Sequence, residues 1–245
     1  MLRVTAEAAV WDDPTVDWAR YDLVLPRSTW DYAERREAFL DWAGSIRRVL
    51  NPLPLLAWNT DKRRYLGDLA AAGVPVVSTV FVDPGDDLEP PDEPFVVKPA
   101  VSAGGRRSAR FERGEVGAAR ELVARIHAEG CAAMVQPFLE DAVEIGLISI
   151  DGRHSHAVRR RVPLPEASER EVLYLDEQID PAEASESDRA VADAALACAG
   201  PDLLYGRVDL MAGVVLELEI TEPSLYLGFA EGAAGRFAEA IARRL

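Results

Sequence analysis

A hairpin-like stretch near the C-terminus, residues 205–225, has a tight turn at Ala212-Gly213 and limits the folds that this chain can adopt. Four charged residues interrupt its two apolar segments: Arg207, Asp209, Glu217 and Glu219. The two charges of each segment lie two positions apart, so each pair points to one face of its strand. If the connection holds an odd number of residues, Asp209 faces Glu217 and Arg207 faces Glu219. The opposite face is then packed by three apolar side chains, Leu216, Leu218 and Ile220.

Three carboxylates on one face predict a metal site. Like charges repel at close range, and a half-buried carboxylate without a partner is costly. A hard divalent cation with oxygen ligands, such as Mg²⁺, relieves both problems. The simpler alternative is an Arg207–Glu219 ion pair with solvated acids at the strand edge. Because three acids interrupt an otherwise apolar hairpin, the sequence favours a metal–phosphate site.

Length and charge narrow the class of protein. A chain of 245 residues can form one large domain or two to three small ones. The net charge of −15 argues against nucleic acid or an anionic membrane as a partner. There is no bilayer-spanning apolar run and no signal-peptide core, and Cys131 and Cys198 lack metal-binding spacing. We therefore expect a cytoplasmic protein.

Lysine use is unusual, since only Lys62 and Lys98 among the 27 basic residues are not arginine. A compact point charge suits contact with phosphate, although chance is a competing explanation. Lys98 ends an apolar strand and precedes a glycine-rich loop around Gly104 and Gly105. Such a loop can fold its N–H groups over a phosphate, or it can be a flexible hairpin turn.

Strands and helices alternate along the chain, which indicates an α/β or α+β fold. At the N-terminus, strand-like Ala6–Trp11 and Tyr21–Leu25 and a helical pattern over Ala33–Val49 predict a thin parallel α/β unit. Ligands bind beyond the carboxyl ends of such strands, where residues 27–32 lie. The later predicted elements are a helix from Asn59 or Thr60 to about Ala72, strand Val76–Val82, helix Glu115–Glu129, strand Ala132–Leu139, hairpin Glu144–Ile150 with His154–Arg161, a helix from Ser185 or Ser187 to Gly200, and helix Glu231–Leu245.

Seven short motifs, in combination and in this order, resemble those of the ATP-grasp superfamily from about Asn59 onward, most of all its glutathione-synthetase-like branch and within it the O-ureidoserine cyclo-ligases. The motifs are Arg27-Ser-Thr-Trp-Asp-Tyr32, Trp58-Asn-Thr-Asp-Lys62, Val96-Val-Lys98-Pro, Gln136-Pro-Phe-Leu139, Ser155-His-Ala-Val-Arg159, Arg207-Val-Asp209 and Glu217-Leu-Glu219. The resemblance implies two α+β subdomains that clamp ATP, preceded by a truncated N-terminal parallel α/β domain. The implied boundaries are 1–57 for the partial substrate domain, 58–134 for the small subdomain with its glycine-rich lid, and 135–245 for the subdomain with the metal site.

The resemblance also assigns roles to residues. ATP would be bound by Lys62, Lys98, Ser102, Gly104, Gly105, Arg106, Gln136, Phe138, Leu139 and Glu144. In this assignment Gln136, Phe138 and Leu139 meet the adenine and Glu144 meets the ribose. Asp209, Glu217 and Glu219 would hold Mg²⁺, and Arg207 and Arg160 would act on the transferring phosphoryl group. The substrate would lie at Arg27, Ser28, Thr29 and Trp30, with Arg27 as the carboxylate anchor.

The resemblance implies an ATP- and Mg²⁺-dependent carboxylate–amine ligase or cyclo-ligase. Such an enzyme forms an acylphosphate on a small amino-acid-like substrate, and a nitrogen nucleophile then attacks it. The alternative is an ATP-binding protein that lacks ligase turnover because its N-terminal substrate domain is incomplete. A purely structural protein is a third reading, and a homodimer is compatible with any of the three.

Overall fold

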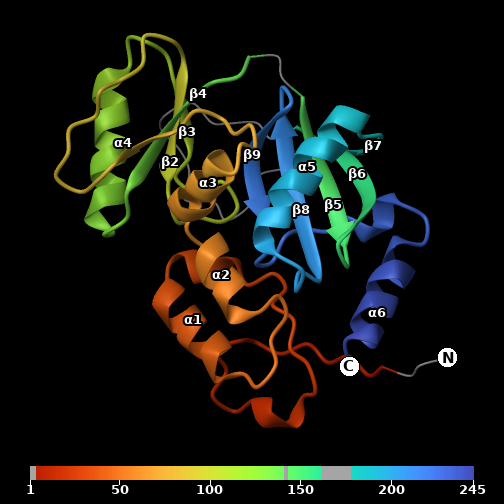
Figure 1. Cartoon of the computed structure of the whole chain (residues 1–245). Coiled ribbons are helices and arrows are strands. Elements are labelled where there is room, and N and C mark those ends of the chain that lie inside the picture. Colours follow the sequence, from red (N-terminus) through yellow and green to blue (C-terminus); the bar gives the residue numbers. More distant parts are fainter. Residues whose placement is uncertain (1–3, 141–142, 162–177) are drawn as a thin grey trace.

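The computed structural model describes residues 4–140, 143–161 and 178–245. Within these residues the fold consists of two antiparallel sheets with helices packed against them, and a mostly helical N-terminal region (Figure 1). The four-stranded sheet has the order β1-β4-β2-β3, and the five-stranded sheet has the order β7-β6-β5-β8-β9. The described chain is therefore α+β, as the alternation of elements predicts.

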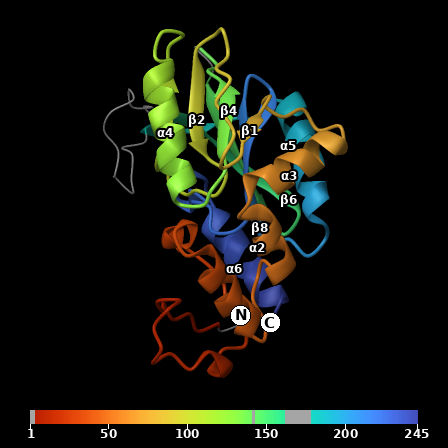
Figure 2. The ribbon, with the colours of Figure 1, turned by 90° about the vertical axis from the view of Figure 1, so that its left-hand side faces the viewer.

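The small sheet is built from short strands with one apolar face. Its strands are β1 (Val80–Val82), β2 (Phe95–Pro99), β3 (Ala109–Phe111) and β4 (Ala133–Pro137). Helix α4 (Val116–Ala128) lies along this sheet (Figure 2) and buries Phe95 and Val97 of β2 in a common core. Because side chains alternate along a strand, Val96 and Lys98 are left on the opposite face, toward the second sheet.

The large sheet carries the charged hairpin. Its strands are β5 (Glu144–Ile150), β6 (Arg153–Arg161), β7 (Gln178–Ala182), β8 (Tyr205–Met211) and β9 (Val214–Glu219). Helix α5 (Glu186–Ala199) packs on one face in a core that includes Leu218 and Ile220. Ser185 caps this helix and forms a capping box with Asp188, which decides between the two predicted N-termini.

The predicted pairing of charged residues across the hairpin is confirmed, but it arises from an irregularity in the strand pairing and not from a connection with an odd number of residues. Asp209 faces Glu217 and Arg207 faces Glu219, although the turn between Met211 and Val214 has only two residues. The turn residues both have positive φ, 52° and 77°, as a tight hairpin turn requires. An irregularity after Asp209 shifts the register and places the acids on one face. Leu216, which lies at this irregularity, lines the cavity, so its predicted core position is wrong.

The predicted N-terminal strands are wrong. Residues 6–11 and 21–25 form no strand, and only an isolated parallel bridge joins Val24 to Val49. This region instead contains two 3₁₀ helices (Trp18–Arg20 and Trp30–Ala33), α1 (Arg36–Ser45) and α2 (Leu53–Asn59). Its apolar residues pack as an aromatic cluster, in which Trp11 meets Phe39 edge-on at 5.7 Å. Two short segments with no further strand beside them cannot form a stable sheet. The conformation of this region is therefore determined by the packing of its side chains.

Helix α3 (Lys62–Ala71) begins later than predicted, because its N-cap is Asp61 rather than Asn59 or Thr60. Asn59 ends α2 and Thr60 follows it, so neither can cap α3, and the Asp61 carboxylate accepts from the Arg63 N–H at 3.0 Å instead. The predicted strand Val76–Val82 is divided between the sheets. Val76 lies opposite Val215 of β9 in an isolated parallel bridge, in which the Val77 N–H donates to the Val215 carbonyl and the Val215 N–H donates to the Pro75 carbonyl. Only Val80–Val82 joins β4.

The only two asparagines of the chain fasten the N-terminal region to the charged hairpin. Asn51 is fully buried; its Nδ2 donates to the carbonyls of Tyr205 at 2.8 Å and Ile220 at 2.6 Å. The Asn51 Oδ1 accepts from the Leu204 N–H at 2.7 Å. Asn59 bonds in the same way to residues 218–221. The C-terminal end of β9 is thus held by two side chains of the N-terminal region, which do not belong to its sheet.

Helix α6 (Ala233–Arg243) closes the chain against β5 and the N-terminal half of β8. Among the residues that the structure describes, no helix is both long and apolar enough to cross a membrane.

Candidate active site

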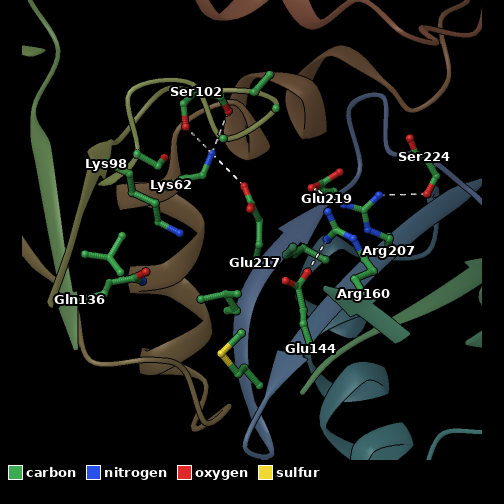
Figure 3. Close-up of a pocket in the computed structure, with 18 of the residues that line it drawn as sticks. Lys62, Lys98, Ser102, Gln136, Glu144, Arg160, Arg207, Glu217, Glu219 and Ser224 are labelled. Atoms are coloured by element: carbon green, nitrogen blue, oxygen red, sulfur yellow. Dashed lines mark hydrogen bonds and ion pairs between the residues drawn. The ribbon is translucent and has the colours of Figure 1, made fainter. Parts of the chain in front are cut away.

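A cavity of about 960 Å³ lies between the two sheets and gathers most of the predicted site residues. One wall carries Lys62, Lys98 and Gln136, and the facing wall carries the acids of the large sheet (Figure 3). The residues come from α3, β2 and β4 on one side and from β5, β6, β8 and β9 on the other. The structure therefore brings together segments that are more than 150 positions apart in the sequence.

The three predicted metal ligands form one cluster. Carboxylate oxygens of Asp209, Glu217 and Glu219 all lie within 4.8 Å of one another. Gly146 of β5 makes this possible, because a side chain at that position would meet Asp209 Oδ1 at 3.0 Å and the Arg207 side chain at 3.3 Å. Oxygen-only ligands at this spacing suit a small hard cation such as Mg²⁺ after a slight approach, so the residues present fit this ion.

Two buried arginines hold the acids of the large sheet. Arg207 donates to Asp209 from Nε at 2.8 Å and Nη2 at 3.0 Å, and to Glu219 at 2.5 Å. Arg160 Nη1 bonds to Asp209 at 2.7 Å and also to Glu144. The Arg207–Glu219 ion pair of the simpler alternative thus exists, but within the three-acid cluster rather than at a solvated edge.

The two lysines face the same cluster from the opposite wall. Lys62 is 6% exposed, and its Nζ lies 2.9 Å from Glu217 Oε1. The same Nζ donates to the backbone oxygen of Ser102 at 2.9 Å, which ties the glycine-rich loop to α3. Burial alone would raise the pKa of Glu217, but Lys62 and Lys98 outweigh it and lower that pKa to about 2. Burial lowers the pKa of Lys98, an effect that Glu217 partly opposes.

Burial acts differently on the other acids of the cavity. It raises the pKa of Glu219 to about 7, although Arg207 opposes the rise. It raises the pKa of Glu144 to about 8, against the effect of Arg160. Perturbed carboxyl groups that gather in one cavity are typical of functional sites rather than of a solvated surface.

The remaining predicted nucleotide residues line the cavity with one exception. Ser102, Gly104, Gly105, Gln136, Phe138, Leu139 and Glu144 are all lining residues. Arg106 is not, since it pairs with Glu34 of the N-terminal region. The Gln136 amide donates to Thr79 Oγ1 at 2.9 Å, and the Arg110 guanidinium lies 4.0 Å from the centre of the Phe138 ring.

The predicted substrate residues are only partly at the cavity. Trp30 lines it, whereas Arg27, Ser28 and Thr29 do not. Arg27 lies over the Tyr205 ring at 5.0 Å, and its Nη2 donates to the Pro223 carbonyl at 2.5 Å. Its role as a carboxylate anchor stays a prediction.

Sequence reasoning missed several residues of the cavity. They include Asn59, Glu222, Ser224 and Tyr226. Three of them follow the metal motif directly, and the acid at 222, set in the segment Ile220-Thr-Glu-Pro-Ser-Leu225, was the available signal. Glu222 is 7% exposed, and burial followed by the charge of Glu219 raises its pKa well above the usual range.

Two facing sheets with a cavity between them, a lysine pair on one wall and three acids on the other, match the arrangement that the motif resemblance to ATP-grasp ligases implies. Comparison with solved structures agrees. The structure of the ATP-grasp ligase PsnB complexed with minimal precursor, Mg and ADP has a TM-score of 0.58 and 22% identity, and covers 91% of this chain and 78% of that one. At this identity the likeness shows the fold alone.

A more specific likeness is to D-cycloserine synthetase DcsG. The crystal structure of that enzyme has a TM-score of 0.85 and 38% identity, and covers 98% of this chain and 90% of the other. The cycloserine biosynthesis protein DcsG of Streptomyces lavendulae is 40% identical over 99% of this chain and 89% of its own length. Residues 2–51 match the model of the D-cycloserine synthetase DcsG N-terminal domain. The chain therefore belongs to the DcsG family of ATP-grasp ligases, which confirms the family predicted from the motifs.

Proposed function

We propose that this protein is an ATP- and Mg²⁺-dependent cyclo-ligase that activates a carboxylate of a small amino-acid-like substrate and joins it to a nitrogen of the same molecule. The observation that carries the proposal is the placement of three acids opposite the only two lysines of the chain, in one cavity. The names of the relatives suggest D-cycloserine as the product. The motif resemblance suggests O-ureidoserine as the substrate.

Each wall of the cavity has a separate task in this proposal. Asp209, Glu217 and Glu219 would hold Mg²⁺, which supplies charge neutralisation of the β- and γ-phosphates when bound. Lys62 and Lys98 approach the same region from the opposite wall and would bind phosphate oxygens. Arg207 lies between the acids and the segment of residues 222–226, and would steady the phosphoryl group as it moves to the substrate carboxylate.

The carboxylate needs activation because it is a poor acceptor for a nitrogen nucleophile. Phosphoryl transfer gives an acylphosphate, which the nitrogen attacks with release of inorganic phosphate. From O-ureidoserine this ring closure gives an N-carbamoyl ring, and hydrolysis must then remove the carbamoyl group as carbon dioxide and ammonia to leave cycloserine. Water would hydrolyse the acylphosphate, so the cavity has to exclude it. The glycine-rich loop, held over the cavity by the Lys62–Ser102 bonds, would serve as the lid. We propose the division 1–57, 58–134 and 135–245 as the corresponding substrate, lid and metal regions.

The proposal is tested by ADP release from Mg·ATP in the presence of O-ureidoserine, supplied separately as the D and L forms. We expect release that depends on both substrate and Mg²⁺. Glu217→Gln should reduce turnover at least 100-fold because it removes a charged ligand, while the far-UV circular dichroism spectrum stays unchanged. Glu121→Gln, an exposed change on α4, is the matched control and should keep full activity.

Two results would speak against the proposal. Full turnover by Glu217→Gln would show that the acids are structural. Mg·ATP binding without any substrate-dependent ADP release would favour the alternative of an ATP-binding protein without ligase turnover.

A further inference from the structure

A segment that follows the metal ligands is held in place by side chains from three parts of the fold. Asn59 Oδ1 accepts from the N–H groups of Ile220 at 2.9 Å and Thr221 at 3.1 Å. Tyr205 donates its hydroxyl to the Thr221 carbonyl at 3.0 Å. On the far side of residue 222, Arg27 donates to Pro223 and Arg207 donates to Ser224 at 3.0 Å. The backbone on both sides of residue 222 is therefore fixed before any ligand arrives.

This fixed segment presents one carboxylate that the protein does not satisfy. Glu222 lines the cavity and is 7% exposed, and its Oε2 has no hydrogen-bond partner among the described residues. A buried carboxylate without a partner is destabilising unless a ligand compensates it. The charge of Arg27 attracts Glu222, but Arg27 Nη2 donates to the Pro223 carbonyl. Its buried Nη1 has no partner in the part of the chain that the structure describes. The protein thus leaves an acceptor in the cavity.

Glu222 is separate from the metal cluster. Among the described residues, only Asp209, Glu217 and Glu219 have oxygens close enough to share one ion. Its surroundings also suit an organic cation. Tyr32 is buried and lines the same cavity as Glu222. A carboxylate and an aromatic ring that line one cavity can recognise an ammonium group through both charge and ring contact.

We propose that Glu222 binds the ammonium group of the amino-acid substrate and thereby selects substrates that carry a cation next to the reacting carboxylate. This assignment rests on the proposed function. Arg207 connects the two sites, because it donates to Glu219 of the metal cluster and to Ser224 of the fixed segment. Arg207 therefore contacts both the proposed metal ligands and the segment that carries Glu222.

The test compares two substrates and two proteins. The substrates are O-ureidoserine and its desamino analogue 3-(ureidooxy)propanoate, which lacks only the ammonium group. For the wild-type protein we expect the KM of the desamino analogue to be about 10- to 100-fold higher, the usual effect of losing a charged hydrogen bond. Glu222→Gln should raise the KM of O-ureidoserine by a similar factor, leave the KM of the analogue within about threefold, and leave the KM of ATP within about twofold.

A role that is only structural would raise both substrate KM values equally, and this result would overturn the assignment. An unchanged KM for O-ureidoserine in Glu222→Gln would overturn it as well. The wild-type comparison does not depend on the folding of the variant, so equal wild-type KM values for the two substrates would be sufficient to reject the proposal. Absence of any substrate-dependent ADP release by the wild-type protein would instead reject the proposed function itself, and this assignment with it.

Discussion

Asn51 provides the sharpest test of how the N-terminal region supports the site. Its side chain is fully buried and makes three hydrogen bonds, to Leu204, Tyr205 and Ile220. Asn51→Ala removes all three at once and leaves two carbonyls and one N–H group without that partner. Because the residue does not line the cavity, no ligand can take the place of the amide.

The magnitude follows from these contacts. A buried hydrogen bond contributes about 1 kcal/mol net, and a buried group left unpaired costs about 1–3 kcal/mol. Allowing for relaxation, the three lost bonds and the space left by the side chain should lower the free energy of unfolding by about 3–5 kcal/mol. A typical folded protein is stable by only about 5–15 kcal/mol, so the change should be large.

Urea denaturation measures the effect. Unfolding can be followed by tryptophan fluorescence, because three tryptophans lie in the N-terminal cluster, and by far-UV circular dichroism. The two signals should give coincident transitions, and in the variant these should shift to a lower urea concentration with an unchanged m-value. Gln178→Ala, which removes an exposed amide from β7, is the control and should change stability by less than about 0.5 kcal/mol. A loss below about 1 kcal/mol in Asn51→Ala would refute the reasoning that this amide fastens the N-terminal region to the sheet.

Two further predictions concern the large sheet. Gly146→Ala places a methyl group 3.0 Å from Asp209 Oδ1, so we expect substrate-dependent ADP release to fall about tenfold or more with little change in circular dichroism, and full activity would contradict this account. Asp151→Ala should cost about 1 kcal/mol at neutral pH, because hydrogen bonds from Arg243 and Arg244 lower the Asp151 pKa. That stabilisation is present above the ordinary pKa of the carboxyl and is lost as pH falls through the lowered one, so urea denaturation should show variant and wild type converging in acid. A difference that persists in acid would mean that Asp151 acts through something other than its charge.

The acids and lysines could be predicted because local rules fix them. Strand periodicity alone places Arg207 with Asp209 and Glu217 with Glu219 on one face. The sequence predicts which residues of the two strands face each other, but not the cause of this pairing. The pairing depends on an irregularity beside Leu216 that no turn rule requires. A charged face that must stay together selects this register even with a two-residue turn.

The parts that escaped prediction depend on contacts between distant segments. Nothing local to Asn51 or Asn59 shows that their amides bond to residues about 150 positions away. The aromatic residues of Ala6–Trp11 and Tyr21–Leu25 suit a strand by propensity, and only the tertiary cluster around Phe39 decides otherwise. Glu222 looked like one more acid in an acidic chain until its burial and its missing partner set it apart.

The charges of the cavity are consistent with the proposal that a chain with a net charge of −15 binds a triphosphate. Lys62 pairs with Glu217, and Arg207 pairs with Asp209 and Glu219. Each of these acids is also a proposed ligand of Mg²⁺, so an ion that takes the acids would release the same two cations for phosphate oxygens. The cations need not travel, because they already lie within hydrogen-bond distance of the acids that would hold the ion. Partner exchange within a preformed cluster would avoid the cost of gathering like charges at the moment of binding, and it would couple binding of the metal to binding of the nucleotide.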